Sequence, residues 1–211
     1  MEKFKFGRIK TNRLKFLKEN NKDHVLIERE GCVLLSAPHG VSQVRLGKPK
    51  AREIGSLSTA LCLSEFANCS LIAKTRNNFD DANFDKDCAY RKTLIAFLKQ
   101  GKTKYLVDFH GLASSRDIDV NLGVNIENNI QTNIEAFERL KKSLETSGFK
   151  VVVDHPFMAS GRTISGAMKS MFNSLWTIQI EINCAITNKP ENFTKYKKLL
   201  GVLLKWINSL D

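Results

Sequence analysis

The sequence lacks several features that would assign it directly to a structural class. No run of about 18 consecutive apolar residues occurs, which argues against a membrane-spanning helix. The charged N-terminus, residues 1–6, lacks the apolar core of a secretory signal peptide. The five cysteines form an odd set without a CxxC spacing. We therefore expect reduced, mostly core-packed thiols in a cytoplasmic protein.

Internal repeats, linkers and low-complexity segments are also absent. A chain of 211 residues is long enough to bury a sizeable core and fits one domain, which we place over residues 1–211. Apolar residues make up 42% and charged residues 26%, as in an ordinary globular protein. Bulk composition therefore predicts a globular fold and leaves the function open.

Charge is the one unusual bulk property. The formal net charge is +11, and residues 1–23 carry eight Lys or Arg against three Asp or Glu. Such a basic segment can attract nucleic acid or an anionic membrane, although it is also typical of a solvated face. No RRM, KH or helix-turn-helix signature accompanies it. A non-catalytic basic module that contacts nucleic acid is therefore kept as an alternative function.

Three apolar segments, residues 32–40, 105–111 and 176–183, have the length and composition of buried strands. Each ends near a side chain that can bind a metal or move a proton, and two of them place Gly directly after His. Glycine in that position indicates a tight turn or a close approach of the backbone. Ligands of open α/β sheets bind at the carboxyl ends of the strands, so these segments predict a hydrolytic metal site.

The rest of the chain alternates between strands and helices. Helical spacing or flanking signals predict helices over residues 52–69, 87–100, 131–146, 165–173 and 191–210, and residues 41–51 are expected to form a polar loop. This alternation predicts a three-layer α/β/α domain around a mixed, largely parallel sheet.

His39 and His110 are the leading candidates for metal ligands. A catalytic zinc site typically has three protein ligands, and neutral imidazole is the commonest zinc ligand. The third ligand should be a carboxylate. Glu53 is well placed if the loop after His39 doubles back, whereas Asp108 shares a strand face with His110. Asp108 could bind the metal instead of Glu53, or orient His110 from behind.

An ordered set of short motifs resembles the N-formylglutamate amidohydrolase-like hydrolases, which have the zinc-carboxypeptidase-like fold. The motifs are SAPHG at 36–40, KARE at 50–53, DAN at 81–83, DFHG at 108–111, RTISG at 162–166 and EIN at 181–183. The resemblance implies zinc, or another divalent metal, held by His39, Glu53 and His110. It also implies Glu181 as the general base that accepts a proton from water and returns it to the leaving nitrogen.

The same resemblance implies that Asp81 and Asn83 line the substrate site. Relatives often carry Arg after that Asn, but Phe84 follows Asn83 here. Arg162 is the leading replacement for clamping a substrate carboxylate, with Arg76 and Arg91 as further candidates. The expected substrate is an N-acyl amino acid or small peptide, and other metal-dependent hydrolases, such as a cell-wall amidase or an esterase, are the remaining alternatives.

Overall fold

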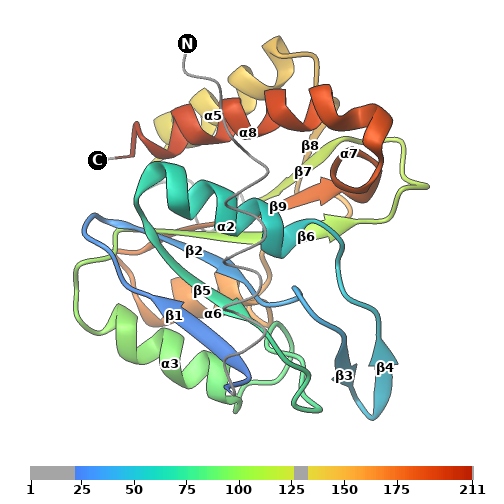
Figure 1. Ribbon diagram of the computed structural model, residues 1–211. Coiled ribbons are helices and arrows are strands. Elements are labelled where there is room, and N and C mark those ends of the chain that lie inside the picture. The colour runs from blue at the N-terminus through green and yellow to red at the C-terminus, as the bar shows by residue number, and fades with distance from the viewer. Residues whose placement is uncertain (1–21, 126–132, 211) are drawn as a thin grey trace.

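The computed structural model describes residues 22–125 and 133–210, whose strands form a seven-stranded sheet between two layers of helices (Figure 1). The strands of this sheet are β1 (His24–Ile27), β2 (Val33–Ala37), β5 (Ser70–Lys74), β6 (Tyr105–Leu112), β7 (Val120–Gly123), β8 (Val151–Val153) and β9 (Trp176–Asn183). The helices are α2 (Ser56–Ala67), α3 (Ala89–Leu98), α5 (Ile134–Thr146), α6 (Ile164–Met171), α7 (Cys184–Asn188) and α8 (Phe193–Ile207). The predicted fold class is confirmed.

Strand order in the sheet is β1-β5-β2-β6-β9-β7-β8. Strands β5, β2, β6 and β9 are mutually parallel, whereas β1 and β7 run antiparallel to their neighbours β5 and β9. The carboxyl ends of β2, β6 and β9 therefore lie together at one edge of the sheet. This topology brings the three segments with candidate site residues to the same place.

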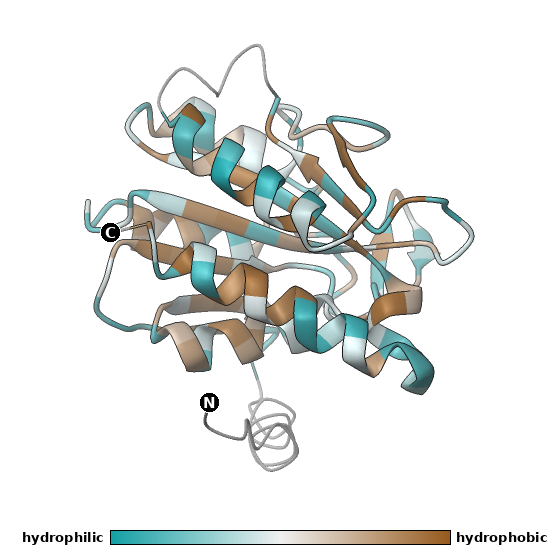
Figure 2. Cartoon of the chain, turned by 90° about the horizontal axis from the view of Figure 1, so that it is seen from above, coloured by the Kyte–Doolittle hydropathy of each residue, from teal (hydrophilic) through white to brown (hydrophobic). Residues whose placement is uncertain are grey.

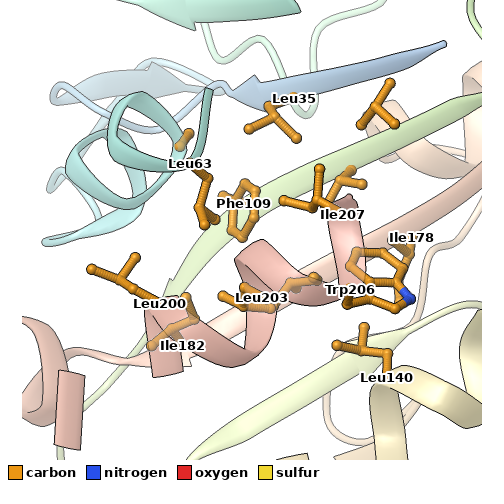
Figure 3. Close-up of a cluster of buried hydrophobic side chains, with 14 of the residues drawn as sticks. Leu35, Leu63, Phe109, Leu140, Ile178, Ile182, Leu200, Leu203, Trp206 and Ile207 are labelled. Carbon is orange, nitrogen blue, oxygen red and sulfur yellow. The ribbon is translucent and has the colours of Figure 1, made fainter. Parts of the chain in front are cut away.

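Helices cover both faces of the sheet, which explains why its central strands are so strongly buried. All residues of β2, β5 and β9 are buried, as is typical of parallel strands between two helical layers. The larger core packs α2, α5 and α8 against one face and includes Leu35, Phe109, Ile178 and Trp206 (Figure 3). Polar residues alternate with apolar ones along the surrounding helices in Figure 2.

The opposite face carries a smaller core under α3 and α6, built around Leu34, Leu106 and Met168. Strand alternation divides β9 between the two faces, because Ile178, Ile180 and Ile182 belong to the larger core. The intervening side chains at 177, 179, 181 and 183 consequently point to the face that bears α6. That face holds the candidate site.

Residues 41–51 are not the polar loop that the sequence predicts. They form a hairpin of β3 (Gln43–Arg45) and β4 (Lys48–Lys50), and Leu46 and Gly47 make its turn with φ of 51° and 73°. Two positive φ angles match the twist of a two-residue hairpin turn. The strands are only three residues long and contain Pro49, so no alternating pattern marks them.

The predicted closing helix also begins later than expected. β9 leads into the short helix α7 and a 3-10 turn, η2 (Pro190–Asn192), before α8 starts at Phe193. Within residues 22–125 and 133–210, no helix combines the length and apolar character needed to cross a membrane. The basic segment 1–23 lies outside the described residues apart from Lys22 and Asp23.

Candidate metal centre

Three side chains from separate segments converge beside the carboxyl ends of β2 and β6. His39 follows β2, His110 lies within β6, and Glu53 precedes α2. One ligand atom from each lies within 4.8 Å of the others. Glu53 Oε1 is 2.6 Å from His39 Nδ1, Glu53 Oε2 is 2.8 Å from His110 Nδ1, and the two Nδ1 atoms are 3.2 Å apart. These three residues could hold a metal ion.

The chain returns from the hairpin to the site through a backbone contact. Glu53 N–H donates to the carbonyl oxygen of His39 at 3.0 Å, so the loop doubles back to the end of β2. Helix α2 begins only at Ser56, and Glu53 therefore sits in the segment before the helix rather than in its first turn. Because the loop returns in this way, the Glu53 carboxylate contacts the His39 imidazole although the two residues are 14 positions apart.

Both glycines that follow the histidines permit close approaches. A Cβ at Gly111 would lie 3.1 Å from Glu53 Cβ, and a Cβ at Gly40 would lie 2.8 Å from Leu57 Cβ. Gly111 N–H also donates to Glu53 Oε2 at 3.1 Å. The prediction of a close backbone approach is therefore confirmed at these positions, and at Gly111 the approaching residue is Glu53 itself.

Each histidine is held from behind by a buried carboxylate. His39 Nε2 lies 2.7 Å from Asp81 Oδ1, and His110 Nε2 lies 3.1 Å from Asp108 Oδ2. Ser36 Oγ in turn donates to Asp108 Oδ1 at 2.6 Å. An imidazole that donates Nε2–H to a carboxylate presents its Nδ1 lone pair on the other side. Both Nδ1 atoms face Glu53.

This donor set fits a divalent cation. Ligands about 2.0 Å from a tetrahedral zinc ion lie roughly 3.3 Å apart, close to the 3.2 Å between the two Nδ1 atoms. The Nδ1 lone pairs of His39 and His110 and the Glu53 carboxylate also repel one another unless a positive charge lies between them. Lys50 Nζ lies 3.2 Å from both His39 Nδ1 and Glu53 Oε1 and supplies part of that charge. A metal ion would supply it more completely.

The same electrostatics act on the ionisable groups. Burial of Glu53 opposes ionisation, but the charges of His110 and His39 outweigh it and hold its pKa well below the ordinary value. Burial works against the charged form of His110, yet Glu53 and Asp108 raise its pKa well above 6.5. The carboxylates thus favour a cation at the imidazoles, and a proton on His110 is what a metal would displace.

Glu181 stands next to this cluster in the sheet. It pairs in register with His110 of β6 on one side and with Asn121 of β7 on the other, and all three side chains share one face. Gln179 Nε2 donates to Glu181 Oε1 at 2.6 Å. Burial raises the pKa of Glu181 to about 7. A carboxylate with such a pKa is suited to accept and return a proton near neutral pH.

The residues expected to bind substrate have different surroundings. Both oxygens of Asp81 are engaged, one by His39 and the other by Arg45 Nε at 2.7 Å. Asn83 Oδ1 accepts from Ile164 N–H at 2.7 Å and so holds the start of α6. Asp81 and Asn83 therefore help to organise the site, and their expected contact with substrate stays a prediction.

The three arginine candidates also differ from one another. Arg162 is exposed in the segment that leads into α6, with its backbone carbonyl bound by the guanidinium of Arg91 at 2.7 Å. Arg91 is buried, and its Nε donates to the carbonyl oxygen of Ala82 at 2.7 Å. Nε and Nη2 of Arg91 thus bind backbone carbonyls and link the segments of Ala82 and Arg162. Arg76 is exposed next to the end of β5, and its N–H binds Asp23.

Two basic residues near the candidate ligands, Arg45 and Lys50, have no role predicted from the sequence. Arg45 binds Asp81 and places its guanidinium carbon 5.1 Å from the ring centre of Phe84, the residue that follows Asn83. Both lie on the β3–β4 hairpin, which the sequence did not predict. The sequence places a basic residue, Lys50, three positions before Glu53, and this spacing alone hinted that Lys50 lies near the site.

No protein-family model and no curated protein matches the sequence. Solved structures with similar folds include a gene product from Agrobacterium tumefaciens, with a TM-score of 0.64 and 15% identity over 90% of this chain and 96% of that chain. N-formylglutamate amidohydrolase from Ralstonia eutropha has a TM-score of 0.56 and 12% identity over 89% and 98%. A bacteriophage poly-gamma-glutamate hydrolase has a TM-score of 0.53 and 14% identity over 93% and 91%. The resemblance predicted from the motifs is thus confirmed at the level of the fold.

Proposed function

We propose that the protein is a zinc-dependent hydrolase that cleaves the amide bond of an N-acyl amino acid or small peptide. The observation that carries the proposal is the convergence of His39, Glu53 and His110 beside Glu181. Two imidazole nitrogens and one carboxylate form the typical protein ligand set of a catalytic zinc, which leaves a position open to substrate and water. The fold shared with amide-cleaving hydrolases supports the same reaction class.

In this proposal His39, Glu53 and His110 hold the metal, and two buried carboxylates orient the imidazoles. Asp81 fixes His39 and Asp108 fixes His110, with Asp108 positioned by Ser36. Asp108 therefore acts behind His110 and Glu53 is the third ligand, because only the Glu53 carboxylate faces both Nδ1 atoms. A zinc ion there would polarise the substrate carbonyl and lower the pKa of a water molecule.

Glu181 is the proposed general base. It accepts a proton from the attacking water, whose oxygen bonds to the carbonyl carbon. The C–N bond then breaks, its electron pair remains on nitrogen, and Glu181 returns the proton to that nitrogen. The products are a carboxylic acid and an amine, so atoms and charge balance. Gln179 keeps the Glu181 carboxylate oriented through its 2.6 Å hydrogen bond.

Positive charge on one side of the site favours a substrate that carries a carboxylate. Arg45 and Lys50 lie on the β3–β4 hairpin beside the ligands, and Arg162 is exposed before α6. The planar guanidinium of Arg162 could bind both oxygens of a carboxylate. Two structures with the same fold are named for glutamate-containing substrates, so glutamate derivatives are the first compounds to test.

The test is hydrolysis of a panel of N-formyl, N-acetyl and N-succinyl amino acids and short glutamyl peptides. Activity should disappear after treatment with a chelator and return on addition of about one zinc ion per chain. A protein that binds zinc stoichiometrically but cleaves no amide in the panel would contradict the proposed reaction. A protein that cleaves amides equally well without metal would contradict the proposed zinc dependence.

A further inference from the structure

Two residues next to Glu181 in the sheet carry buried side-chain oxygens without hydrogen-bond partners. The oxygens are Asn121 Oδ1 and Gln179 Oε1, and neither has a partner among residues 22–125 and 133–210. Asn121 is completely buried and Gln179 is 2% exposed. A buried carbonyl oxygen left without a donor is uncommon and unfavourable, so each such group calls for a physical explanation.

The sheet register places both residues next to the proposed general base. Asn121 is directly opposite Glu181 in the antiparallel pair of β7 and β9, and Glu181 is opposite His110 in the next pair. Gln179 is two residues before Glu181 on the same face of β9. A row across three strands therefore runs from a proposed metal ligand through the general base to Asn121.

The orientation of each amide group is fixed by its nitrogen. Asn121 Nδ2 donates to the carbonyl oxygen of Phe157 at 2.8 Å, and Gln179 Nε2 donates to Glu181 Oε1 at 2.6 Å. Because both amide nitrogens already donate hydrogen bonds, the two amide oxygens are the atoms left to bind a ligand. Both can only accept hydrogen bonds.

The segment after β8 covers this end of the row. A Cβ at Gly123 would lie 2.9 Å from the carbonyl oxygen of Phe157, 3.3 Å from Ala159 N and 3.4 Å from Gln179 Cβ. Gly123 therefore lets residues 157–159 pack directly over β7, where the carbonyl oxygen of Phe157 binds Asn121.

We propose that Asn121 and Gln179 bind the leaving nitrogen of the substrate, and that this site therefore takes amides of primary amines. The inference rests on the proposed function, because the leaving nitrogen is the atom to which Glu181 returns a proton. Asn121 Oδ1, Gln179 Oε1 and the Glu181 carboxylate are three acceptors. The released amine takes one proton from Glu181 and a second from the carboxylic acid product, and its ammonium form then has three N–H donors. The scissile N–H of the substrate engages one of the acceptors before cleavage.

A site that binds the leaving nitrogen through its N–H distinguishes amides of primary amines from esters and N-alkylated amides, which the metal cluster alone does not. An ester has no hydrogen on its leaving oxygen, and an N-alkylated amide, including one formed by proline, has none on its nitrogen. Either would leave the buried acceptors unpaired during catalysis. A site built to hydrogen-bond a substrate N–H discriminates strongly against analogues that lack it.

The direct test measures binding of product analogues to the chelator-treated, metal-free protein by titration calorimetry. Glutamate and 2-hydroxyglutarate are the probes, because they differ only in an amine against a hydroxyl group. Glutamate should bind more tightly, and Asn121→Leu and Gln179→Leu should each reduce its advantage by roughly tenfold to a hundredfold, as expected for hydrogen bonds to a charged group.

Gln43→Leu is the matched control. Gln43 is also fully buried with an unpartnered Oε1, but it lies on the β3–β4 hairpin, outside the row of His110, Glu181 and Asn121. Its replacement should leave the preference for glutamate unchanged. If Asn121→Leu and Gln179→Leu also leave the preference unchanged, the two oxygens bind only water or nothing, and the proposal is overturned.

A second measurement uses the wild-type protein and stays decisive if the variants do not fold. The zinc-loaded enzyme should cleave an N-acyl amino acid at least tenfold faster than its N-methylated counterpart, and equal rates would overturn the proposal. The two failures can be told apart. Glutamate binding that depends on Asn121 and Gln179 without any amide hydrolysis would refute the proposed function, whereas hydrolysis indifferent to the N–H would refute this inference alone.

Discussion

Gly111 and Glu53 are in direct contact: Gly111 N–H donates to Glu53 Oε2 at 3.1 Å, and a Cβ on Gly111 would come within 3.1 Å of Glu53 Cβ. Strand β6 thus supplies His110 as a candidate ligand and, one residue later, the space for a second ligand from another segment. The position of Glu53 in the site therefore depends on the absence of a side chain at Gly111.

Replacement of Gly111 should therefore weaken metal binding without unfolding the protein. Gly111→Ala pushes Glu53 away by a few tenths of an ångström, and we expect roughly a tenfold loss in zinc affinity, as for other changes that misplace a ligand. Competition with a chromogenic chelator measures the affinity. Gly201→Ala is the control, since a Cβ there meets nothing within 4 Å, and it should leave zinc affinity unchanged. Equal affinity in both variants would mean that Gly111 does not position Glu53.

The carboxylate behind His39 should matter nearly as much as a ligand. Asp81→Asn keeps the shape of the side chain but removes the charge that holds His39 and binds Arg45. Loss of such an outer carboxylate typically costs about 10- to 100-fold in metal affinity. Asp87→Asn is the control, because Asp87 is exposed and, among residues 22–125 and 133–210, pairs with Lys92 alone. A zinc affinity unaffected by Asp81→Asn would contradict the orienting role of Asp81.

Glu181 should make the stability of the metal-free protein depend on pH. Burial raises its pKa from 4.5 to about 7, so the folded protein holds this proton more tightly than the unfolded chain. The resulting stability is fully present below about pH 4.5 and is lost as the pH rises through about 7. Relative to Glu181→Gln, the wild type should lose on the order of 3 kcal/mol across this range.

Urea unfolding of both proteins at pH 5 and pH 8, with a chelator present, measures this difference. The gap between wild type and Glu181→Gln should widen from pH 5 to pH 8, in favour of the variant. A constant gap would show that Glu181 titrates at its ordinary pKa and is not held in a desolvated position.

The substrate carboxylate is expected to bind a guanidinium. Arg162→Lys should raise KM for a carboxylate-bearing substrate with little change in kcat, since a point charge cannot replace a planar fork. Arg91→Lys is not a suitable comparison, because Arg91 holds the backbone of Ala82 and Arg162. Lys92→Met, a surface change, provides the control. Unchanged KM and kcat in Arg162→Lys would remove Arg162 from the substrate site.

Much of the site could be predicted because it depends on strand ends. Short apolar runs that finish near His39, His110 and Glu181 identify parallel strands, and topology then brings their carboxyl ends together. The carboxylate of Glu53 was identifiable as a candidate but not separable from Asp108, since that choice depends on how the loop after β2 returns. The backbone contact from Glu53 to His39 settles the geometry of that return and is invisible in the sequence.

Contacts between segments without a regular pattern were the part that could not be predicted. Arg45 and Lys50 reach the site from a hairpin of two three-residue strands, too short to show alternation. Asn121 reaches Glu181 only through the antiparallel pairing of β7 and β9, whose register no local signal gives. The motif that contains Asp81 predicts a place at the substrate, but the contacts of Asp81 with His39 and Arg45 could not be predicted, because those residues lie elsewhere in the chain.

The most direct test of the central claim compares zinc content and hydrolysis in His110→Ala and Glu181→Gln. The account predicts that His110→Ala loses zinc and activity together, because it removes a ligand. Glu181→Gln should keep one zinc per chain, while kcat falls by roughly 10²–10⁴-fold, because the amide cannot accept a proton. Full activity in a zinc-loaded Glu181→Gln protein, or loss of zinc from it, would contradict the division between metal ligands and general base.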